Sequence, residues 1–159
     1  MQELIQIFKK QGQEFINDLM SDYVVVTEKL SGSSFSFEKD GNTFKYFKGN
    51  VNRPINIIDR TLMVYYEPAI NYIQTSVKPI LNQIPDNWRF CFEYFVHNEP
   101  GVIRYDNLPK NKLVLTHIQV KGENGKIAKI IEDPRVIKDW SNTLNVTPLV
   151  PIFQGYLTS

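Results

Sequence analysis

Residues 23–34 read YVVVTEKLSGSS, and this run predicts a strand that ends on a lysine and a tight turn. Tyr23 to Thr27 is apolar and β-branched, which favours a strand. Lys29 follows directly, and Gly32 lies within a turn of small residues, where it would let the backbone approach a phosphate. Long cationic side chains are rarely placed where they lose water. A partly desolvated amine can attack an electrophile, whereas the plain structural alternative is an amine that reaches out to solvent.

Outside this run, the sequence predicts β-hairpins that alternate with helices. The predicted strands, chosen for apolar and aromatic content, are 23–27, 35–37, 43–47, 88–96, 112–120 and 147–153. The predicted helices, chosen for helical spacing of apolar residues, are 3–20, 59–84 and 133–144. Antiparallel hairpins mixed with helices predict an α+β fold, with antiparallel sheets flanked by helices.

Local signals add detail to these helices. Asp59 and Asp133 are placed as N-caps, and Pro134 is suited to a first helical position. Pro68 and Pro79 interrupt the pattern of 59–84, which predicts a kink or a division into two helices.

Composition limits the class of protein. A chain of 159 residues is long enough for one domain with a core, and a net charge of +1 excludes a strong overall basic field. Cys91 is the only cysteine, which excludes an internal disulfide and a thiolate metal cluster. Met1 is followed by a polar amphipathic stretch rather than a signal peptide, and no apolar run reaches the length of a membrane span. These features predict a cytoplasmic protein.

Lys29 and Glu93 are charged residues on predicted strands that are otherwise apolar. Each has a plain structural alternative, because a lysine can extend to water and a glutamate can face solvent from an edge strand. Together, an activated amine, a small-residue turn and a carboxylate are the components of a nucleotidyl-transfer pocket. The pair therefore forms the candidate site.

Several segments resemble motifs of the covalent nucleotidyltransferases, the group that holds ATP-dependent DNA ligases, RNA ligases and mRNA capping enzymes. Residues 28–33 (EKLSGS) resemble motif I, and 88–95 (WRFCFEYF) resemble motif III. Residues 114–120 (VLTHIQV) lie where motif IIIa is expected. The 64 positions from Lys29 to Glu93 are similar to the spacing in RNA ligases, and 58–67 (IDRTLMVYYE) resemble phage ligase-like proteins.

The resemblance implies an ATP-grasp-like adenylation domain that uses ATP and Mg²⁺. Lys29 would attack the α-phosphate of ATP, release pyrophosphate and hold AMP through a phosphoramidate bond. AMP would then pass to the 5′-phosphate of a polynucleotide, RNA in preference to DNA, and a 3′-hydroxyl would displace it to seal the strand. In the same family pattern, Glu93 would bind the ribose, while Thr27 and Glu28 would line the adenine side through their backbone.

Other roles stay open within the resemblance. Lys48 is a candidate for the basic residue of motif Ia that contacts the substrate phosphate, with Arg53 and Arg60 as alternatives and a solvated hairpin lysine as the plain structural one. His117 stands in motif IIIa, where the family usually offers an aromatic ring to the adenine, so it either stacks on the base or lies at the rim of the site.

The sequence also departs from the family pattern. Ser31 and Ser34 replace the acidic or histidine residue before the motif I glycine and the arginine or asparagine after it. Motifs IV and V, which hold the metal and contact the α-phosphate, would follow the last apolar strand, and the sequence ends at Ser159. We therefore expect residues 1–159 to be one partial adenylation domain, with unassigned metal ligands. Loss of one preorganised electrostatic group costs on the order of a hundredfold in rate, so weak or no lysine adenylylation is expected.

Three other functions remain compatible with the sequence. The chain could be a DNA-ligase-type adenylation domain, or a non-catalytic phage module that binds a nucleotide or single-stranded nucleic acid, with its aromatic residues as stacking platforms. It could also be a structural protein without a ligand. The simpler interpretation of most aromatic residues is that they form the core, because they alternate along the predicted hairpins.

Overall fold

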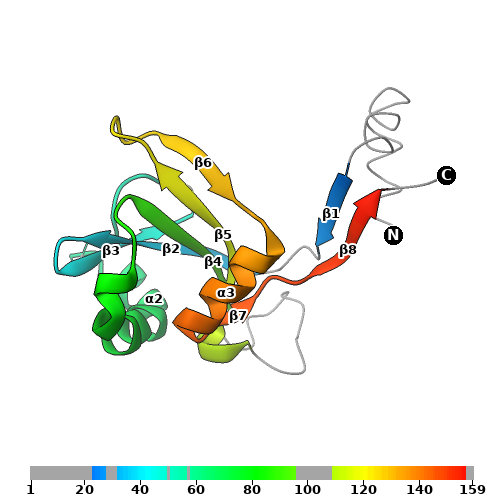
Figure 1. Cartoon of the computed structure of the whole chain (residues 1–159). Helices are drawn as coiled ribbons and strands as arrows, with labels where there is room; N and C mark the ends of the chain where they lie inside the picture. Colours follow the sequence, from blue (N-terminus) through cyan, green and yellow to red (C-terminus); the bar gives the residue numbers. More distant parts are fainter. Residues whose placement is uncertain (1–22, 28–31, 50, 57, 96–108, 157–159) are drawn as a thin grey trace. The chain divides into compact units, whose positions relative to one another are not determined.

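The computed structural model describes residues 23–27, 32–49, 51–56, 58–95 and 109–156, and it has an α+β fold. The chain divides into two compact units. One contains β1 (Tyr23–Thr27) and β8 (Pro151–Tyr156), which pair antiparallel as a two-stranded sheet. The other extends from Leu30 to Leu149 and contains the remaining elements (Figure 1).

A six-stranded, mostly antiparallel sheet forms the centre of the larger unit. Its strands run in the order β3-β2-β4-β5-β6, and β7 forms a parallel pair with β5. Their bounds are β2 (Ser33–Asp40), β3 (Thr43–Lys48), β4 (Trp88–Tyr94), β5 (Leu113–Lys121), β6 (Ile127–Ile131) and β7 (Thr147–Pro148). The expected α+β class is thereby confirmed.

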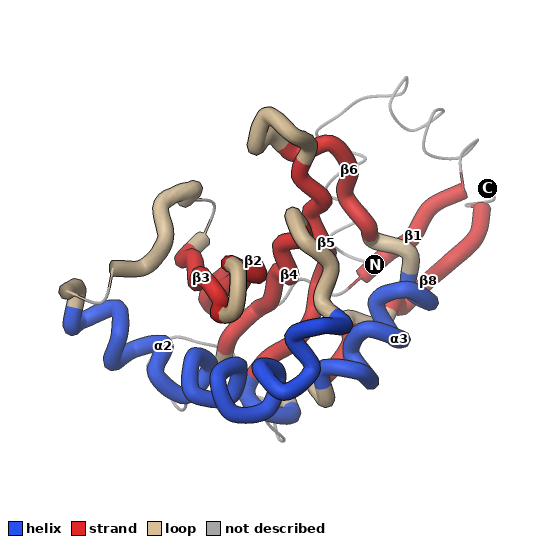
Figure 2. The backbone as a smooth tube through the Cα atoms, turned by 60° about the vertical axis from the view of Figure 1, so that its left-hand side comes forward, coloured by secondary structure: helices blue, strands red, loops and turns tan. Residues whose placement is uncertain are grey.

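Two helices cover one face of this sheet. They are α2 (Arg60–Tyr72) and α3 (Pro134–Leu144), which Figure 2 shows on the same side of the strands. Alternate strand residues supply the core beneath them, and the rings of Phe37 and Phe90 stack with centroids 5.1 Å apart. Of the aromatic residues expected in the core, Tyr46 is partly buried and packs against it, and the others are buried, namely Phe35, Phe37, Phe44, Phe90, Phe92 and Phe95. These rings therefore pack in the core, as the simpler interpretation predicts.

The helix boundaries follow the caps that the sequence predicts. The Asp59 carboxylate accepts from the Leu62 N–H at 3.1 Å, and Asp133 caps α3 with Pro134 at its first turn. Pro68 lies inside α2 without ending it. After Tyr72 the chain continues as a π-helix (Ile73–Val77) and a 3₁₀-helix (Lys78–Gln83) that contains Pro79. A proline disrupts the hydrogen bonding of the preceding turn, which accounts for the predicted division of the helix.

Several boundaries differ from the sequence prediction. The strand expected over 147–153 is two strands, β7 and β8, which belong to different units. The strand β6 was not expected, because its residues are largely exposed and alternate poorly. The strands over 88–96 and 112–120 are observed as β4 and β5 with slightly shifted ends. The helix predicted over 3–20 lies outside the described residues.

Candidate functional site

The face of the sheet opposite the two helices carries a polar pocket of about 260 Å³. Three adjacent strands, β2, β4 and β5, form its floor, and the chain after β3 and the start of β6 contribute to its wall. The pocket is lined by Ser34, Phe35, Ser36, Gly49, Asn52, Arg89, Cys91, Phe92, Glu93, Thr116, His117, Gln119 and Ile127.

Strand register explains why polar residues gather on this face. Residues at alternate positions of a strand share a face, so Arg89, Cys91 and Glu93 lie opposite the buried aromatic residues of β4. Cys91 pairs with His117 on β5. The register shifts between Cys91 and Phe92, and Thr116 is the extra residue of this β-bulge. The bulge keeps His117 on the pocket face of the sheet.

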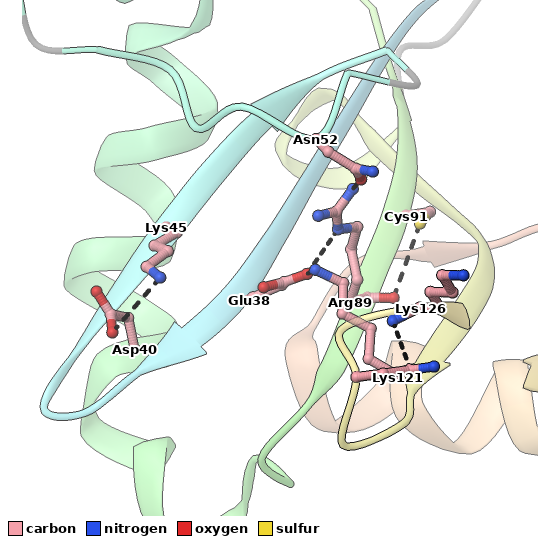
Figure 3. A network of polar contacts seen from close by, with 9 residues as sticks. Glu38, Asp40, Lys45, Asn52, Arg89, Cys91, Lys121 and Lys126 are labelled. Carbon is pink, nitrogen blue, oxygen red and sulfur yellow. Dashed lines mark hydrogen bonds and ion pairs between the residues drawn. The ribbon is translucent and has the colours of Figure 1, made fainter. Parts of the chain in front are cut away.

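Arg89 is the most buried charged residue of the pocket, with only 4% of its surface exposed. Its Nε donates to Glu38 Oε1 at 2.7 Å, and its Nη1 contacts Asn52 Oδ1 at 3.4 Å (Figure 3). The guanidinium carbon lies 3.7 Å from the centre of the Phe47 ring. Lys121 also pairs with Glu38 Oε1, so two cations share one carboxylate and the cluster keeps a positive charge.

The pKa values of Glu38 and Glu93 shift in opposite directions, although burial acts to raise both. Burial alone would raise the pKa of Glu38, but hydrogen bonds and charge from Lys121 and Arg89 together lower it below its usual range. Burial raises the pKa of Glu93, and the backbone N–H of Gly32 only partly opposes this shift. No cation within the described part of the chain pairs with Glu93.

Gly32 lies directly against Glu93. A Cβ atom added to Gly32 would lie 2.8 Å from the Tyr94 carbonyl oxygen and 3.0 Å from Glu93 Oε2. Real Cβ atoms do not approach backbone oxygen this closely, so a side chain at position 32 would displace the strand or the carboxylate. The close approach that the sequence predicts for this glycine is therefore to Glu93.

Buried polar atoms without partners concentrate in the pocket. Of four such atoms among the described residues, three belong to pocket-lining side chains: Ser36 Oγ, Arg89 Nη2 and Glu93 Oε2. Leaving one buried donor or acceptor unpaired costs about 1–3 kcal/mol. A polar ligand with both donors and acceptors would supply the missing partners.

Two neighbouring side chains on β5 contact the ring nitrogens of His117. Its Nδ1 lies 2.9 Å from Thr116 Oγ1, and its Nε2 lies 3.5 Å from the Gln119 amide nitrogen. Burial lowers the pKa of His117, although the charge of Glu132 acts in the other direction. The ring is therefore neutral near pH 7.

The structure brings some of the predicted site residues together. Glu93 and His117 line the same pocket, and Gly32 contacts Glu93. Lys48 and Arg53 are exposed and flank pocket residues Gly49 and Asn52 in the chain without lining the pocket themselves.

The predicted roles of the proposed nucleophile and its neighbours are not tested by the structure. Lys29 and Glu28 lie outside the described residues, and Thr27 is the last residue of β1 in the smaller unit. Their roles stay predictions.

Sequence reasoning did not identify Arg89, Glu38 or Asn52 as site residues. A signal for Arg89 was present, because it precedes Glu93 by four positions on an apolar strand and so shares its face. Glu38 was assigned to a turn, whereas it lies within β2. Asn52 comes to the pocket only through the path of the chain after β3, which no local pattern predicts.

The described residues do not form a ready-made metal site. Within 32–49, 51–56, 58–95 and 109–150 no three His, Cys, Asp or Glu side chains cluster closely enough to hold an ion. Glu38 is already neutralised by Arg89 and Lys121.

The partial burial of Glu93 predicts a pH effect on stability. Because the folded-state pKa of Glu93 is raised, the unfolded chain releases this proton first as pH rises. The free energy of unfolding should therefore fall as pH rises from about 4.5 through the folded pKa. Glu93→Gln removes this dependence and should be more stable than wild type at pH 7.

Urea unfolding of both proteins between pH 4 and pH 8 measures the effect, and the difference between the two curves cancels contributions from other groups. Glu123→Gln, which changes an exposed glutamate, is the matched control and should stay parallel to wild type. A constant difference between Glu93→Gln and wild type at every pH would contradict the assignment.

The described helices include none that is long and apolar enough to cross a bilayer. The sequence matches no protein-family model, and no curated protein is significantly similar to it.

Proposed function

We propose that the chain is the nucleotide-binding part of a covalent nucleotidyltransferase of the polynucleotide-ligase type, acting on RNA ends with ATP. The observation that carries the proposal is the set of unpaired buried atoms in the pocket, a carboxylate oxygen of Glu93, a guanidinium nitrogen of Arg89 and the Ser36 hydroxyl. A nucleoside offers hydroxyl donors and base acceptors in one molecule, which matches this mixture of partners.

The dimensions of the pocket suit the nucleoside portion of such a ligand. Its volume of about 260 Å³ lies just below the range of small-molecule sites, which span roughly 300–1,000 Å³. Glu93 and Arg89 are four residues apart on β4, which corresponds to roughly 13 Å along the strand. The pocket floor therefore presents a carboxylate at one end and a guanidinium at the other.

Glu93 is the best-placed group for a sugar. A carboxylate accepts two hydrogen bonds without donating any, and hydrogen bonds to a charged acceptor are stronger than neutral ones. A ribose hydroxyl above β4 that donates to the Glu93 carboxylate would compensate for the burial that raises the pKa of Glu93. This role agrees with the one that the resemblance to motif III implies.

The covalent step in this proposal belongs to Lys29. Its neutral amine attacks the α-phosphorus of ATP, a nitrogen–phosphorus bond forms, and the bond from that phosphorus to the β-phosphate oxygen breaks. Pyrophosphate leaves with the bonding electrons, and the amine proton passes to solvent. Mg²⁺ would arrive with the phosphates of ATP and neutralise their charge. The ATP-grasp-like fold is part of the same proposal.

Binding of the nucleotide gives the first test. Titration calorimetry with an ATP analogue that carries a non-hydrolysable bridge between the α- and β-phosphates should show saturable binding. Glu93→Gln should weaken it about 10- to 150-fold, because a hydrogen bond to a charged group contributes about 1.5–3 kcal/mol.

The control is again Glu123→Gln, which should bind like wild type. A single-stranded oligonucleotide titrated alone tests the alternative function as a nucleic-acid-binding module. Saturation by the oligonucleotide without any heat from the ATP analogue, or equal affinities of wild type and Glu93→Gln, would overturn the proposal.

A further inference from the structure

The tautomer of His117 follows from the hydrogen bonds around Thr116. The Thr116 hydroxyl lies 3.1 Å from the Cys91 carbonyl oxygen, which can only accept, so the single hydroxyl proton is donated there. The same hydroxyl oxygen lies 2.9 Å from His117 Nδ1 and has no second proton to offer. His117 Nδ1 must therefore carry the proton and donate to Thr116.

This arrangement leaves His117 Nε2 as a lone-pair acceptor. Its described polar contact is the Gln119 amide nitrogen at 3.5 Å, which is at the long limit for a hydrogen bond. Burial keeps the ring neutral near pH 7 by lowering its pKa, against the opposing charge of Glu132. The lone pair thus remains available to a ligand in the pocket that His117 lines.

We propose that His117 selects the base of the bound nucleotide, with Nε2 accepting a hydrogen bond from an exocyclic amine such as the 6-amino group of adenine. The inference rests on the proposed function of the pocket. It differs from the stacking role that the resemblance implies, because the recognising group is the ring nitrogen and not the ring face.

Strand spacing places His117 at a suitable distance from the sugar site. His117 pairs with Cys91, which is two residues from Glu93 and therefore roughly 7 Å along β4. That step is comparable to the span from a ribose hydroxyl to the far edge of the attached purine. A nucleotide whose sugar binds Glu93 can therefore present its base edge to His117.

A base with a carbonyl oxygen in place of the amine would place that oxygen, a hydrogen-bond acceptor, next to His117 Nε2, which is also an acceptor. Inosine has this exchange at position 6 and also carries a hydrogen on N1, where adenosine has an acceptor, and it matches adenosine in the rest of the molecule. We expect the inosine analogue of the ATP probe to bind about 10- to 100-fold more weakly, since a good base-edge contact discriminates by about 1–3 kcal/mol.

Two substitutions of His117 separate acceptance from stacking. His117→Gln places an amide oxygen near the position of Nε2 and should keep most of the preference for the adenine analogue. His117→Phe keeps an aromatic ring but has no acceptor, so it should bind both analogues with similar affinity. If the ring stacks instead, His117→Phe retains affinity and preference while His117→Gln loses affinity.

Thr116→Val tests the hydrogen-bond relay without changing His117. Without the hydroxyl, Nδ1 loses its acceptor and the tautomer is no longer selected, so the preference between the two analogues should decrease. Thr143→Val, at an exposed position of α3, is the matched control and should behave as wild type.

Calorimetry with both analogues on wild type and the three pocket variants tests whether His117 selects the base. Equal binding of both analogues by wild type, or an unchanged preference in His117→Phe, would overturn the assignment of His117 while leaving the nucleotide site intact. Binding of neither analogue would instead remove the proposed function and this inference with it. Circular dichroism of each variant confirms that the comparison is made on folded protein.

Discussion

Lys29→Ala is expected to abolish covalent transfer of AMP to the chain. In the proposed reaction the Lys29 amine supplies the nitrogen of the new bond to phosphorus, so alanine leaves the reaction without its nucleophile. Other steps depend on this one, because AMP reaches the polynucleotide only from the lysine. The loss should therefore be complete, whereas nucleotide binding at the Glu93 pocket should change much less.

Incubation with ATP labelled at the α-phosphate, followed by denaturing electrophoresis, measures the transfer. A phosphoramidate is stable to alkali and sensitive to acid, which distinguishes it from label bound in other ways. Lys45→Ala is the matched control, because Lys45 is an exposed lysine of β3 with 46% of its side chain accessible. We expect slow labelling of wild type and of Lys45→Ala.

Two outcomes would contradict the covalent proposal. One is equal labelling of Lys29→Ala and wild type. The other is a wild-type protein that stays unlabelled even when a segment carrying motifs IV and V is supplied, under conditions in which calorimetry shows that the nucleotide saturates the pocket. The second outcome would leave a nucleotide-binding protein without transferase activity.

Arg89→Ala is expected to lower the free energy of unfolding by about 3–5 kcal/mol, the range for breaking a buried ion pair from one side. The Arg89 side chain is 5% exposed, and its Nε lies 2.7 Å from Oε1 of Glu38, whose side chain is 13% exposed. Alanine also removes the cation from the Phe47 ring and leaves a cavity beside it. Lys121 remains as a partner of Glu38 and limits the loss.

Denaturant unfolding followed by tryptophan fluorescence measures this effect, since Trp88 adjoins Arg89 on β4. Lys45→Ala again serves as the control, because its ion pair with Asp40 is exposed on both sides and such pairs contribute about 0–1 kcal/mol. A double-mutant cycle with Glu38→Gln isolates the coupling between the two charges. A loss below 1 kcal/mol for Arg89→Ala would show that the pair is solvated in solution.

The two predictions concern different properties of the protein. Glu38, Arg89 and Lys121 form a charged cluster that supports the floor of the pocket, so its disruption should appear first in stability. Lys29 should affect chemistry without affecting this cluster. Observing the two effects separately would show that nucleotide transfer and the stability of the sheet depend on different residues.

Local patterns in the sequence were sufficient for most elements of the larger unit. The caps Asp59 and Asp133 depend on neighbouring residues alone, and they are present as predicted. The alternation of large aromatic residues along β2 and β4 likewise predicted the core. These features are encoded within a few positions of each other.

The pocket depends on pairings between distant segments. Glu93 was recognisable as a charge on an apolar strand, and its burial confirms that it is an unusual position. The residues around Glu93 could not be predicted from the sequence. Ser36, Arg89 and His117 share a face with it only through the register of three strands and the bulge at Thr116. A shift of one residue in that register would turn each of these side chains to the other face.

The sequence alone therefore determined the α+β class, the helix caps and the aromatic core, and it singled out Glu93, because each follows from local periodicity or from one conspicuous charge. Only the tertiary structure decided that Arg89 and His117 belong to the same pocket as Glu93, that Glu38 neutralises a buried guanidinium, and that three polar atoms there lack partners. The physical reason is that hydrogen-bond satisfaction and burial are properties of strand pairing across the sheet, which no short stretch of sequence contains.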